Sequence, residues 1–553
     1  MDEACIATAN TVIPEPIDGE LLGEISRELS NLSNMIKADV ADDDNIISSD
    51  PLVKFDEITE TSISSTDSAS DSDRSASPDN CVLTAPCDDN NWGPETFTAS
   101  HGLDQIESVH KVAHVAPNCD VVSLLSEIIE HDNIDQDPVY VVDLTTVMRK
   151  VHDWKQLLPR VQPYYAMKCN GDDAICRLLN ASGCGFDCAS QAEIEAALSY
   201  GCPAEKIIYA NPCKQASMLR FASQHGVRKM TADNVEELHK IQAIFPTAEI
   251  VIRIAVDDSK SVCRFNSKFG APASEWRSLL ATCRTLELEV VGFSFHVGSG
   301  CGDVQPFVDA VASARQAFDL AGELGFAPSL LDCGGGFPGH ETAGFSFADV
   351  AAVLGPAIER HFPAAGGVRV IAEPGRYMVS ASHTYAVAVI AKRALTAAHL
   401  ADAAAIEAFG TAPTAAELAA AAEENKDAVI SSADEASKDD NRAHGAAAQS
   451  PDVALYINDG VYGSFNCVVF DHVTVEPRVL RAAAGGNLPA VRTKLFGPTC
   501  DSIDVVHPCT TLPALSIGDW LWCANMGAYT RCAASRFNGQ GVHTVHYIWR
   551  GLP

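Results

Sequence analysis

The 553-residue sequence lacks several features that define other classes of protein. It contains no apolar run of about 18 or more residues, so it predicts no transmembrane helix. Its nineteen cysteines include no CxxC pair and no regular spacing, which disfavours a zinc site and a disulfide framework. The opening MDEACIATAN lacks a basic segment followed by an apolar core, so no secretory signal is expected. These features favour free thiols in a reducing compartment, and we expect a cytoplasmic protein without a metal site.

Basic residues are also scarce. The chain has 39 Lys and Arg against 73 Asp and Glu, and this net charge of −34 argues against nucleic-acid binding by the bulk surface. Residues 1–100 alone hold 22 acids and four bases, are rich in Ser, Asp and Asn, and contain few aromatics. Such a segment cannot bury enough apolar surface to offset its ordering entropy, so we expect residues 1–105 to be disordered. A second biased stretch, Ala-rich and acidic, covers about 395–450 and is interpreted as an insertion.

Between these two stretches the chain alternates regularly between short β-rich runs and helical patterns. Parallel strands with crossover helices are the expected result, and eight such units over about 220 residues predict an α/β fold with a closed (β/α)8 barrel over residues 146–381. The eight runs are PYYAMK (163–168), GFDCA (185–189), KIIYA (206–210), RKMTA (228–232), AEIVIRIAV (248–256), LEVVGFSFHV (288–297), SLLDC (329–333) and RVIAE (369–373).

The pattern changes after residue 381. The runs ALYIND, CVVFDHVTV, DWLWCAN and HTVHYIW read as strands without crossover helices, which predicts an antiparallel C-terminal β domain over 382–553. VYVVDL (139–144) precedes the barrel and is expected to join that domain, so residues 106–145 are interpreted as its N-terminal part.

Polar residues collect where the predicted barrel strands end. Lys168 ends the first strand, Asp187 lies near the end of the second, Arg253 lies within the fifth and His296 ends the sixth. Singly, Lys168 could be a rim charge, Asp187 a helix cap and His296 a satisfied core histidine. In barrels of this kind, however, the chemistry lies at the C-terminal ends of the strands, so we expect these side chains to share one site.

Two further motifs give that site its chemistry. CGGGFPG (333–339) follows the seventh strand, and three glycines let backbone N–H groups approach a phosphate. EPGRY (373–377) follows the eighth strand and supplies an arginine for the same phosphate and a carboxylate for a heterocyclic nitrogen. A lysine at a buried mouth is suited to condense with an aldehyde. Together these parts predict a pyridoxal 5'-phosphate (PLP) site.

The motifs PYYAMKCN, GFDCAS, IIYANPCKQ, SFHVGSGC, LDCGGGFPG, AEPGRY, INDGVYGSFNC, FDH, GPTCDSID and NMGAYT resemble those of the eukaryotic ornithine decarboxylases. They occur in the family's order over about 110–545, interrupted by the Ala-rich insertion. The resemblance implies a PLP-dependent carboxy-lyase that converts L-ornithine to putrescine and CO2, the first step of polyamine biosynthesis. It also implies a homodimer whose active sites are shared across the interface.

The resemblance also implies residue roles around the cofactor. Lys168 matches the lysine that bonds to PLP, His296 the imidazole that stacks on its ring, and Glu373 the carboxylate on its ring nitrogen. Asp187, Glu193 and Arg253 match charged neighbours of the lysine end. The matches to the phosphate-binding shell are Ser299, Gly334, Gly335, Gly336, Arg376 and Tyr529.

For the substrate, Cys500 matches the acid that protonates the product carbon, so that Lys168, Cys500, His296 and Asp187 form the implied catalytic set. Asp471 and Asp501 match carboxylates that hold the distal amine, and Tyr462 lies beside them. In the family, the equivalents of Cys500 and Asp501 come from the other subunit. The residue before Asp471 is a phenylalanine, where animal members often carry tyrosine.

The resemblance implies two protein contacts besides the shared site. The family's inhibitor, antizyme, would dock near 216–239, where Arg220, Arg228 and Lys229 suggest local positive charge. Lys268 and Asp504 match an ion pair across the dimer interface, expected at an exposed rim.

Two alternative functions stay open. A catalytically dead homologue could act as a decoy for antizyme, but such homologues lose cofactor or catalytic residues that are kept here. A sister decarboxylase could act on lysine, arginine or diaminopimelate, although GPTCDSID and FDH favour ornithine.

Overall fold

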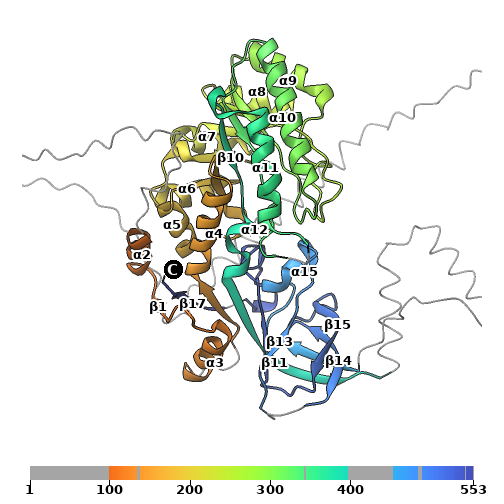
Figure 1. Cartoon of the computed structure of the whole chain (residues 1–553). Coiled ribbons are helices and arrows are strands. Elements are labelled where there is room, and N and C mark those ends of the chain that lie inside the picture. Colours follow the sequence, from red (N-terminus) through yellow and green to blue (C-terminus); the bar gives the residue numbers. More distant parts are fainter. Residues whose placement is uncertain are drawn as a thin grey trace, which may run out of the picture. The chain divides into compact units, whose positions relative to one another are not determined.

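The computed structural model describes two long ranges of the chain, which together carry a barrel and a β-sheet domain (Figure 1). The Ala-rich stretch and nearly all of the acidic N-terminal segment lie outside the described residues. Helix α2 (Ala99–Glu107) begins inside the segment predicted to be disordered, so regular structure starts before residue 105. The described residues are 99–396 and 452–551, without 133, 135, 136, 342, 343, 484–487 and 542.

Eight parallel strands close into a barrel in the order β10-β3-β4-β5-β6-β7-β8-β9, which confirms the predicted (β/α)8 architecture. Seven of the eight predicted runs contain one of these strands entirely, and the first run, PYYAMK, overlaps β3, which begins earlier at Val161. The barrel strands are β3 (Val161–Ala166), β4 (Gly185–Cys188), β5 (Ile207–Tyr209), β6 (Lys229–Ala232), β7 (Glu249–Arg253), β8 (Glu289–Ser294), β9 (Leu330–Asp332) and β10 (Arg369–Ala372).

Helices alternate with the strands and cover the barrel (Figure 1). Their starts follow local capping chemistry: the side chains of Asp172, Ser190 and Asn234 each accept a backbone N–H in the first turn of the helix that follows. The helices are α5 (Asp173–Ala181), α6 (Gln191–Ser199), α7 (Ala216–Gln224), α8 (Val235–Ile244), α9 (Ala273–Thr285), α10 (Gln305–Glu323), α11 (Phe347–His361) and α12 (Arg376–Val379).

The β domain is a nine-stranded, mostly antiparallel sheet. The run VYVVDL forms β2 and pairs with β11 and β17, which confirms that a segment before the barrel joins this domain. Three pairs are parallel, namely β1 with β17, β17 with β2, and β12 with β14. The strands are β1 (Val112–His114), β2 (Val139–Asp143), β11 (His383–Ala394), β12 (Val453–Ile457), β13 (Arg478–Arg481), β14 (Ala490–Phe496), β15 (Val505–Pro513), β16 (Trp520–Cys523) and β17 (Thr544–Trp549).

One predicted strand is wrong. In CVVFDHVTV the first four residues form a short helix, α15 (Cys467–Phe470), and the rest is irregular. The Val-rich composition favours a strand, but the N–H groups of Asp471 and Val473 both turn back to the Cys467 carbonyl oxygen. His472 then adopts a left-handed conformation with φ 54°, which ends any extended path.

Two hydrogen bonds tie the barrel mouth to the β domain. The N–H of Tyr529 donates to the Cys169 carbonyl at 3.0 Å, and the Asn170 side chain donates to the Gly527 carbonyl at 2.8 Å. They hold the segment that carries Tyr529 against the end of β3. In the two described ranges, no helix is both long and apolar enough to span a membrane.

Candidate active site

Lys168 lies directly after β3, in a single 3-10 turn (Met167–Cys169) whose other two residues are buried. Its side chain is nevertheless 38% exposed, because it faces a cavity of about 540 Å³ that Glu193, Arg531 and Cys532 also line. Its ammonium contacts the Asp187 carboxylate. Burial lowers the pKa of Lys168, but the carboxylates of Asp187 and Glu373 outweigh that effect and raise it.

Asp187 lies on β4 and is fully buried. Ser190, not Asp187, caps helix α6, so the bland interpretation of Asp187 as a helix cap is wrong. Burial raises the pKa of Asp187, while Lys168 and Arg253 oppose the shift. The carboxylate oxygen Oδ1 accepts no hydrogen bond from the described residues, so it is available to a ligand.

Glu373 follows β10 and lies beside a second acid, Asp332, to which the sequence analysis gave no role. Asp332 is the last residue of β9, is fully buried and accepts the Gly334 N–H at 2.9 Å. Burial raises the pKa of Asp332 to about 7. Burial also raises the pKa of Glu373 well above its usual value, and the nearby acids Asp332 and Asp187 raise it further. The signal for Asp332 was its position, since it ends a barrel strand as Lys168 and Glu373 do.

His296 is held as a neutral ring. Its Nδ1 accepts the Gly298 N–H at 3.0 Å, which leaves the proton on Nε2. Burial lowers the pKa of His296, and the positive charges of Arg253 and Lys168 lower it further. The ring of Phe265 packs edge-on against the imidazole at a centroid distance of 4.9 Å.

The glycine run after β9 passes so close to this histidine that side chains are excluded. A Cβ on Gly335 would lie 2.7 Å from His296 Nε2, and one on Gly334 would overlap the Phe295 carbonyl oxygen. Gly334 and Gly336 have φ of 59° and 103°, which glycine adopts without strain. The run is therefore a bare backbone surface beside His296.

Arg376 connects the predicted phosphate shell to one of the predicted substrate acids. One nitrogen, Nη2, donates to Ser299 Oγ and to Asp471 Oδ1, both at 2.8 Å. The guanidinium lies 5.0 Å from the centre of the Tyr529 ring. Asp471 thus reaches the barrel mouth, and its Oδ2 is buried without a hydrogen-bond partner in the described part of the chain.

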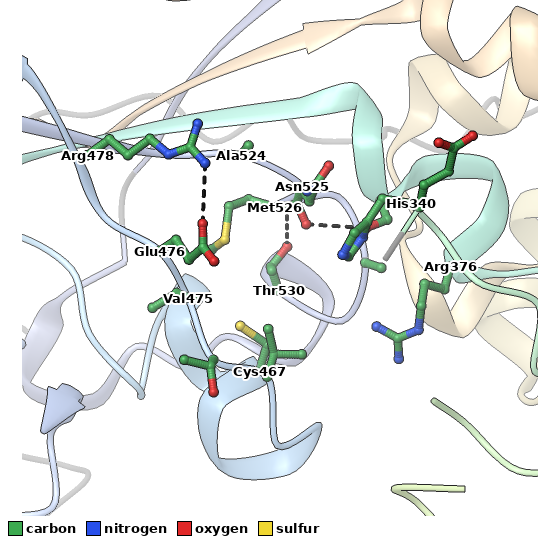
Figure 2. A pocket seen from close by; sticks show the side chains of 15 residues that line it. His340, Arg376, Cys467, Val475, Glu476, Arg478, Ala524, Asn525, Met526 and Thr530 are labelled. Atoms are coloured by element: carbon green, nitrogen blue, oxygen red, sulfur yellow. Dashed lines mark hydrogen bonds and ion pairs between the residues drawn. The ribbon is translucent and has the colours of Figure 1, made fainter. Parts of the chain in front are cut away.

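Arg376 also lines a second cavity, of about 450 Å³, on the side of the β domain (Figure 2). His340, Cys467 and Met526 line it with Arg376, and an ion pair between Arg478 and Glu476 crosses one end (Figure 2). The Lys168 ammonium is not among its lining groups.

The other predicted substrate residues form a separate surface group consisting of Tyr462, Cys500 and Asp501. The Tyr462 hydroxyl donates to Asp501 Oδ2 at 2.5 Å, and this bond lowers the pKa of Asp501. Cys500 is exposed. Among the described residues, no hydrogen bond or ion pair joins this surface group to the mouth cluster, by which we mean Lys168, Asp187, His296, Asp332 and Glu373.

Two side chains that were predicted to be exposed, Asp504 and Lys229, are buried. Asp504 is only 1% exposed, and its carboxylate accepts hydrogen bonds from Val461 N, Thr499 N and Thr499 Oγ1, so it holds loops of its own chain and not an exposed rim. Lys229 is buried with its ammonium on the Glu205 carbonyl, and Arg228 pairs with Glu249 and Glu289. Of the three basic residues predicted near 216–239, Arg220 is exposed and is in none of these pairs.

The mouth cluster fits pyridoxal phosphate. Asp187 Oδ1 and Glu373 Oε1 are buried acceptors without a donor among the described residues, as a cationic ring nitrogen and its neighbours require. The glycine run, Ser299 and Arg376 offer backbone N–H groups, a hydroxyl and a guanidinium for a phosphate. A lysine amine at a barrel mouth, opposite these groups, defines a barrel-fold PLP enzyme.

Comparison with known families narrows this class. Residues 144–380 match the family described as "Pyridoxal-dependent decarboxylase, pyridoxal binding domain", and residues 419–527 match "Pyridoxal-dependent decarboxylase, C-terminal sheet domain". The chain belongs to the pyridoxal-dependent decarboxylases, so its cofactor is PLP and its class of reaction is amino-acid decarboxylation.

Similar proteins include both enzymes and a regulator. The chain is 41% identical over 414 residues to ornithine decarboxylase of Mus musculus, which covers 75% of this chain and 81% of the relative. It is 42% identical over 426 residues to antizyme inhibitor 2 of Xenopus laevis, covering 77% and 84%. Among solved structures, the arginine decarboxylase of Paramecium bursaria Chlorella virus superposes with a TM-score of 0.65 at 30% identity, over 77% of this chain and 100% of the other.

Proposed function

We propose that the protein is an ornithine decarboxylase, which converts L-ornithine to putrescine and CO2. The observation that carries the proposal is the assembly at one barrel mouth of Lys168, the buried acids and the Arg376–Asp471 pair. The identity to mouse ornithine decarboxylase supports the same substrate. The product diamine makes the protein a source of putrescine for polyamine biosynthesis.

Four residues of the mouth cluster, Lys168, Asp187, His296 and Glu373, each have a task in this reaction. PLP, when bound, supplies a conjugated ring that accepts the electron pair left by the departing CO2. Lys168 provides the amine that bonds to it, Asp187 holds that amine in place, and Glu373 holds a proton at the ring nitrogen. His296, neutral and fixed by Gly298, presents a flat face without adding a competing charge.

The phosphate of the cofactor would bind to the glycine run and its neighbours. Arg376 Nη2 donates to Ser299 Oγ at 2.8 Å, and the proposed phosphate shell joins these two groups with the backbone of Gly334, Gly335 and Gly336. A doubly charged phosphate there would find N–H and guanidinium donors, which form strong charge-assisted hydrogen bonds. Tyr529 lies beside Arg376, and the positive charge of Arg253 acts on the buried acids of the mouth cluster.

Selectivity for ornithine rests on Asp471 and Asp501. The buried, unpartnered Oδ2 of Asp471 suits the distal ammonium of a basic amino acid. A substrate without that ammonium would leave Asp471 Oδ2 buried without a donor, which is unfavourable. Lysine is one methylene longer, and a single methylene is worth only about 1–3 kcal/mol, so weak lysine turnover is expected.

We propose that two chains complete each site. The surface group lies on the outside of its own chain, and exposed apolar side chains surround it and α15: Phe470 is 69% exposed, Ile503 61% and Val262 57%. A second copy that covers these side chains would bring its own Cys500 and Asp501 to the mouth cluster. Cys500 would then donate a proton to the product carbon, and Asp501 would share the distal ammonium with Asp471.

The similarity to antizyme inhibitor 2 supports a second candidate, a decoy that binds antizyme without catalysis. Against it, Lys168, Asp187, Glu373 and Cys500 are all present, and the first three are assembled in one cluster. Antizyme remains a candidate partner of either protein. A reducing, cytoplasmic setting is supported by the sixteen cysteines of the described ranges, all of which are free thiols.

The test is a decarboxylase assay on the purified full chain, with and without added PLP. Carboxyl-labelled ornithine, lysine, arginine and diaminopimelate are supplied in parallel, and labelled CO2 and the product amines are measured. The proposal expects PLP-dependent CO2 and putrescine from ornithine, with much less product from the others. Bound PLP with no CO2 from any amino acid would support the decoy, and faster turnover of another amino acid would reassign the substrate.

A further inference from the structure

Asp332 is a buried acid that the proposed function does not use. It ends β9 and pairs with Ser294 of β8 and Ile371 of β10, so it lies at the C-terminal end of the barrel strands. Gly334 ties it to Glu373: the Gly334 N–H donates to Asp332 Oδ1 at 2.9 Å, and the Gly334 carbonyl accepts the Glu373 N–H at 2.6 Å. The two acids are therefore held side by side by one residue.

Gly334 brings the two carboxyl groups together, and Asp332 Oδ2 and Glu373 Oε1 are both buried without a hydrogen-bond partner among the described residues. Two ionised carboxylates cannot bond to one another, because neither has a donor, whereas a single proton on one of them would join the pair. The charged groups that face the pair are Asp187, which disfavours a second negative charge, and Lys168 and Arg253, which favour the first.

We propose that Asp332 is a positioning residue that carries this proton on Oδ2 and donates it as a hydrogen bond to Glu373. Glu373 then keeps its negative charge for the cationic ring nitrogen of the cofactor, although it is buried among acids. The positive charge of that nitrogen favours ionisation of Glu373 over Asp332, so the proton resides on the acid farther from it. The inference rests on PLP binding and not on ornithine as the substrate.

Asparagine and leucine separate the roles that Asp332 could have. An asparagine can accept the Gly334 N–H with its oxygen and donate to Glu373 with its amide, as a protonated aspartic acid does. A leucine has a similar size and neither group. We expect Asp332→Asn to bind PLP within about threefold of the wild type, and Asp332→Leu to bind about tenfold or more weakly, as for a lost hydrogen bond to a charged group.

The measurement is titration of each full-length apoprotein with PLP, followed by absorbance, with circular dichroism of the same samples to establish folding. The series is repeated in a Glu373→Gln background, where no negative charge needs a donor. There the difference between Asp332→Asn and Asp332→Leu should shrink to less than about threefold, because the two sites are coupled. A purely structural role for Asp332 would leave that difference unchanged.

Three outcomes overturn the inference. Asp332→Asn binding PLP about tenfold or more weakly would show that the negative charge of Asp332 is needed, and this arm stands even where the leucine variant does not fold. An undiminished difference in the Glu373→Gln background would show that Asp332 does not act through Glu373. A wild-type protein that binds no PLP would remove the basis of the inference, whereas PLP binding without ornithine turnover would overturn only the proposed substrate.

Discussion

The mouth cluster and the surface group both contain carboxylic acids, and their surroundings shift the pKa values of those acids in opposite directions. In the mouth cluster, burial raises the pKa values of Asp187, Asp332 and Glu373. In the surface group, hydrogen bonds from Tyr462 and a backbone N–H lower the pKa of Asp501. One chain thus brings the proposed cofactor-binding side chains together, and leaves Cys500 and Asp501 outside that cluster. The proposed division of work between two subunits would account for this difference.

The largest effect is expected from the lysine of the mouth cluster. Lys168→Ala removes the amine that bonds to PLP, so the absorbance of the bound cofactor should disappear and turnover should fall by at least about a hundredfold. Lys111→Ala, at an exposed lysine, is the control and should change neither. Retention of full activity by a purified Lys168→Ala protein would refute the site.

A smaller and different loss is expected from the surface group. Cys500→Ala removes a proton donor, worth about 10²–10⁴-fold in the step it serves, but leaves the mouth cluster intact. CO2 release should therefore survive better than putrescine formation, and PLP absorbance should be normal. The exposed Cys213 offers a matched control, since Cys213→Ala should behave as the wild type. Clean putrescine production at the normal rate by Cys500→Ala would assign the proton to another group.

The free energy of unfolding should depend on pH differently through the acids of the mouth cluster and through that of the surface group. The pKa of Asp332 in the folded protein is about 7, above its usual 3.8. The protonated carboxyl therefore contributes its full stability to the fold below about pH 3.8, and this stability is lost as pH rises through 7. Asp332→Asn should therefore flatten the decline in the apoprotein's free energy of unfolding between pH 4 and 7, by a few kcal/mol at most.

Asp501 should act in the opposite direction. Its lowered pKa gives stability that is present above pH 3.8 and is lost only as pH falls below that value. Asp501→Asn should leave the slope between pH 4 and 7 unchanged. Urea unfolding of both apoproteins at several pH values tests the pair, and equal slopes for wild type and Asp332→Asn would contradict the raised pKa.

The smallest effect is expected outside both regions. Shortening residues 400–448 should leave PLP binding and turnover within about twofold of the wild type, because this Ala-rich stretch holds none of the site residues. Absorbance and CO2 release measure the two properties in the same preparation. Loss of PLP binding in the shortened protein would mean that the proposed domain boundaries, 146–381 for the barrel and 382–553 for the β domain, are drawn wrongly.

The sequence predicted the barrel because its strands are buried on both faces. Runs such as KIIYA and RKMTA are continuous and short, and a helix follows each of them, so pattern and position agree. CVVFDHVTV misled because valines favour strands only where a neighbouring strand is available, and here the chain turns back at His472 instead.

A site residue was predictable where its residue type is rare at the end of a buried strand, and was not predictable where that type is common there. A lysine after a buried strand is unusual, but an aspartate at a strand end such as Asp332 is ordinary, and its pairing with Glu373 depends on strands distant in sequence. The burial of Asp504 depends on N–H groups from two separate loops, near Val461 and Thr499. Such loop contacts leave no periodic trace in the sequence.

The division of work between two chains is tested most directly by mixing two variants that each form little putrescine, Lys168→Ala and Cys500→Ala, with putrescine formation as the measured activity. Random exchange places half of the chains in mixed dimers, each with one intact and one doubly defective site. If the surface group of one chain completes the mouth cluster of the other, activity should return to about a quarter of the wild type. A mixture that stays inactive after demonstrated subunit exchange would contradict the account, because each chain would then complete its own site.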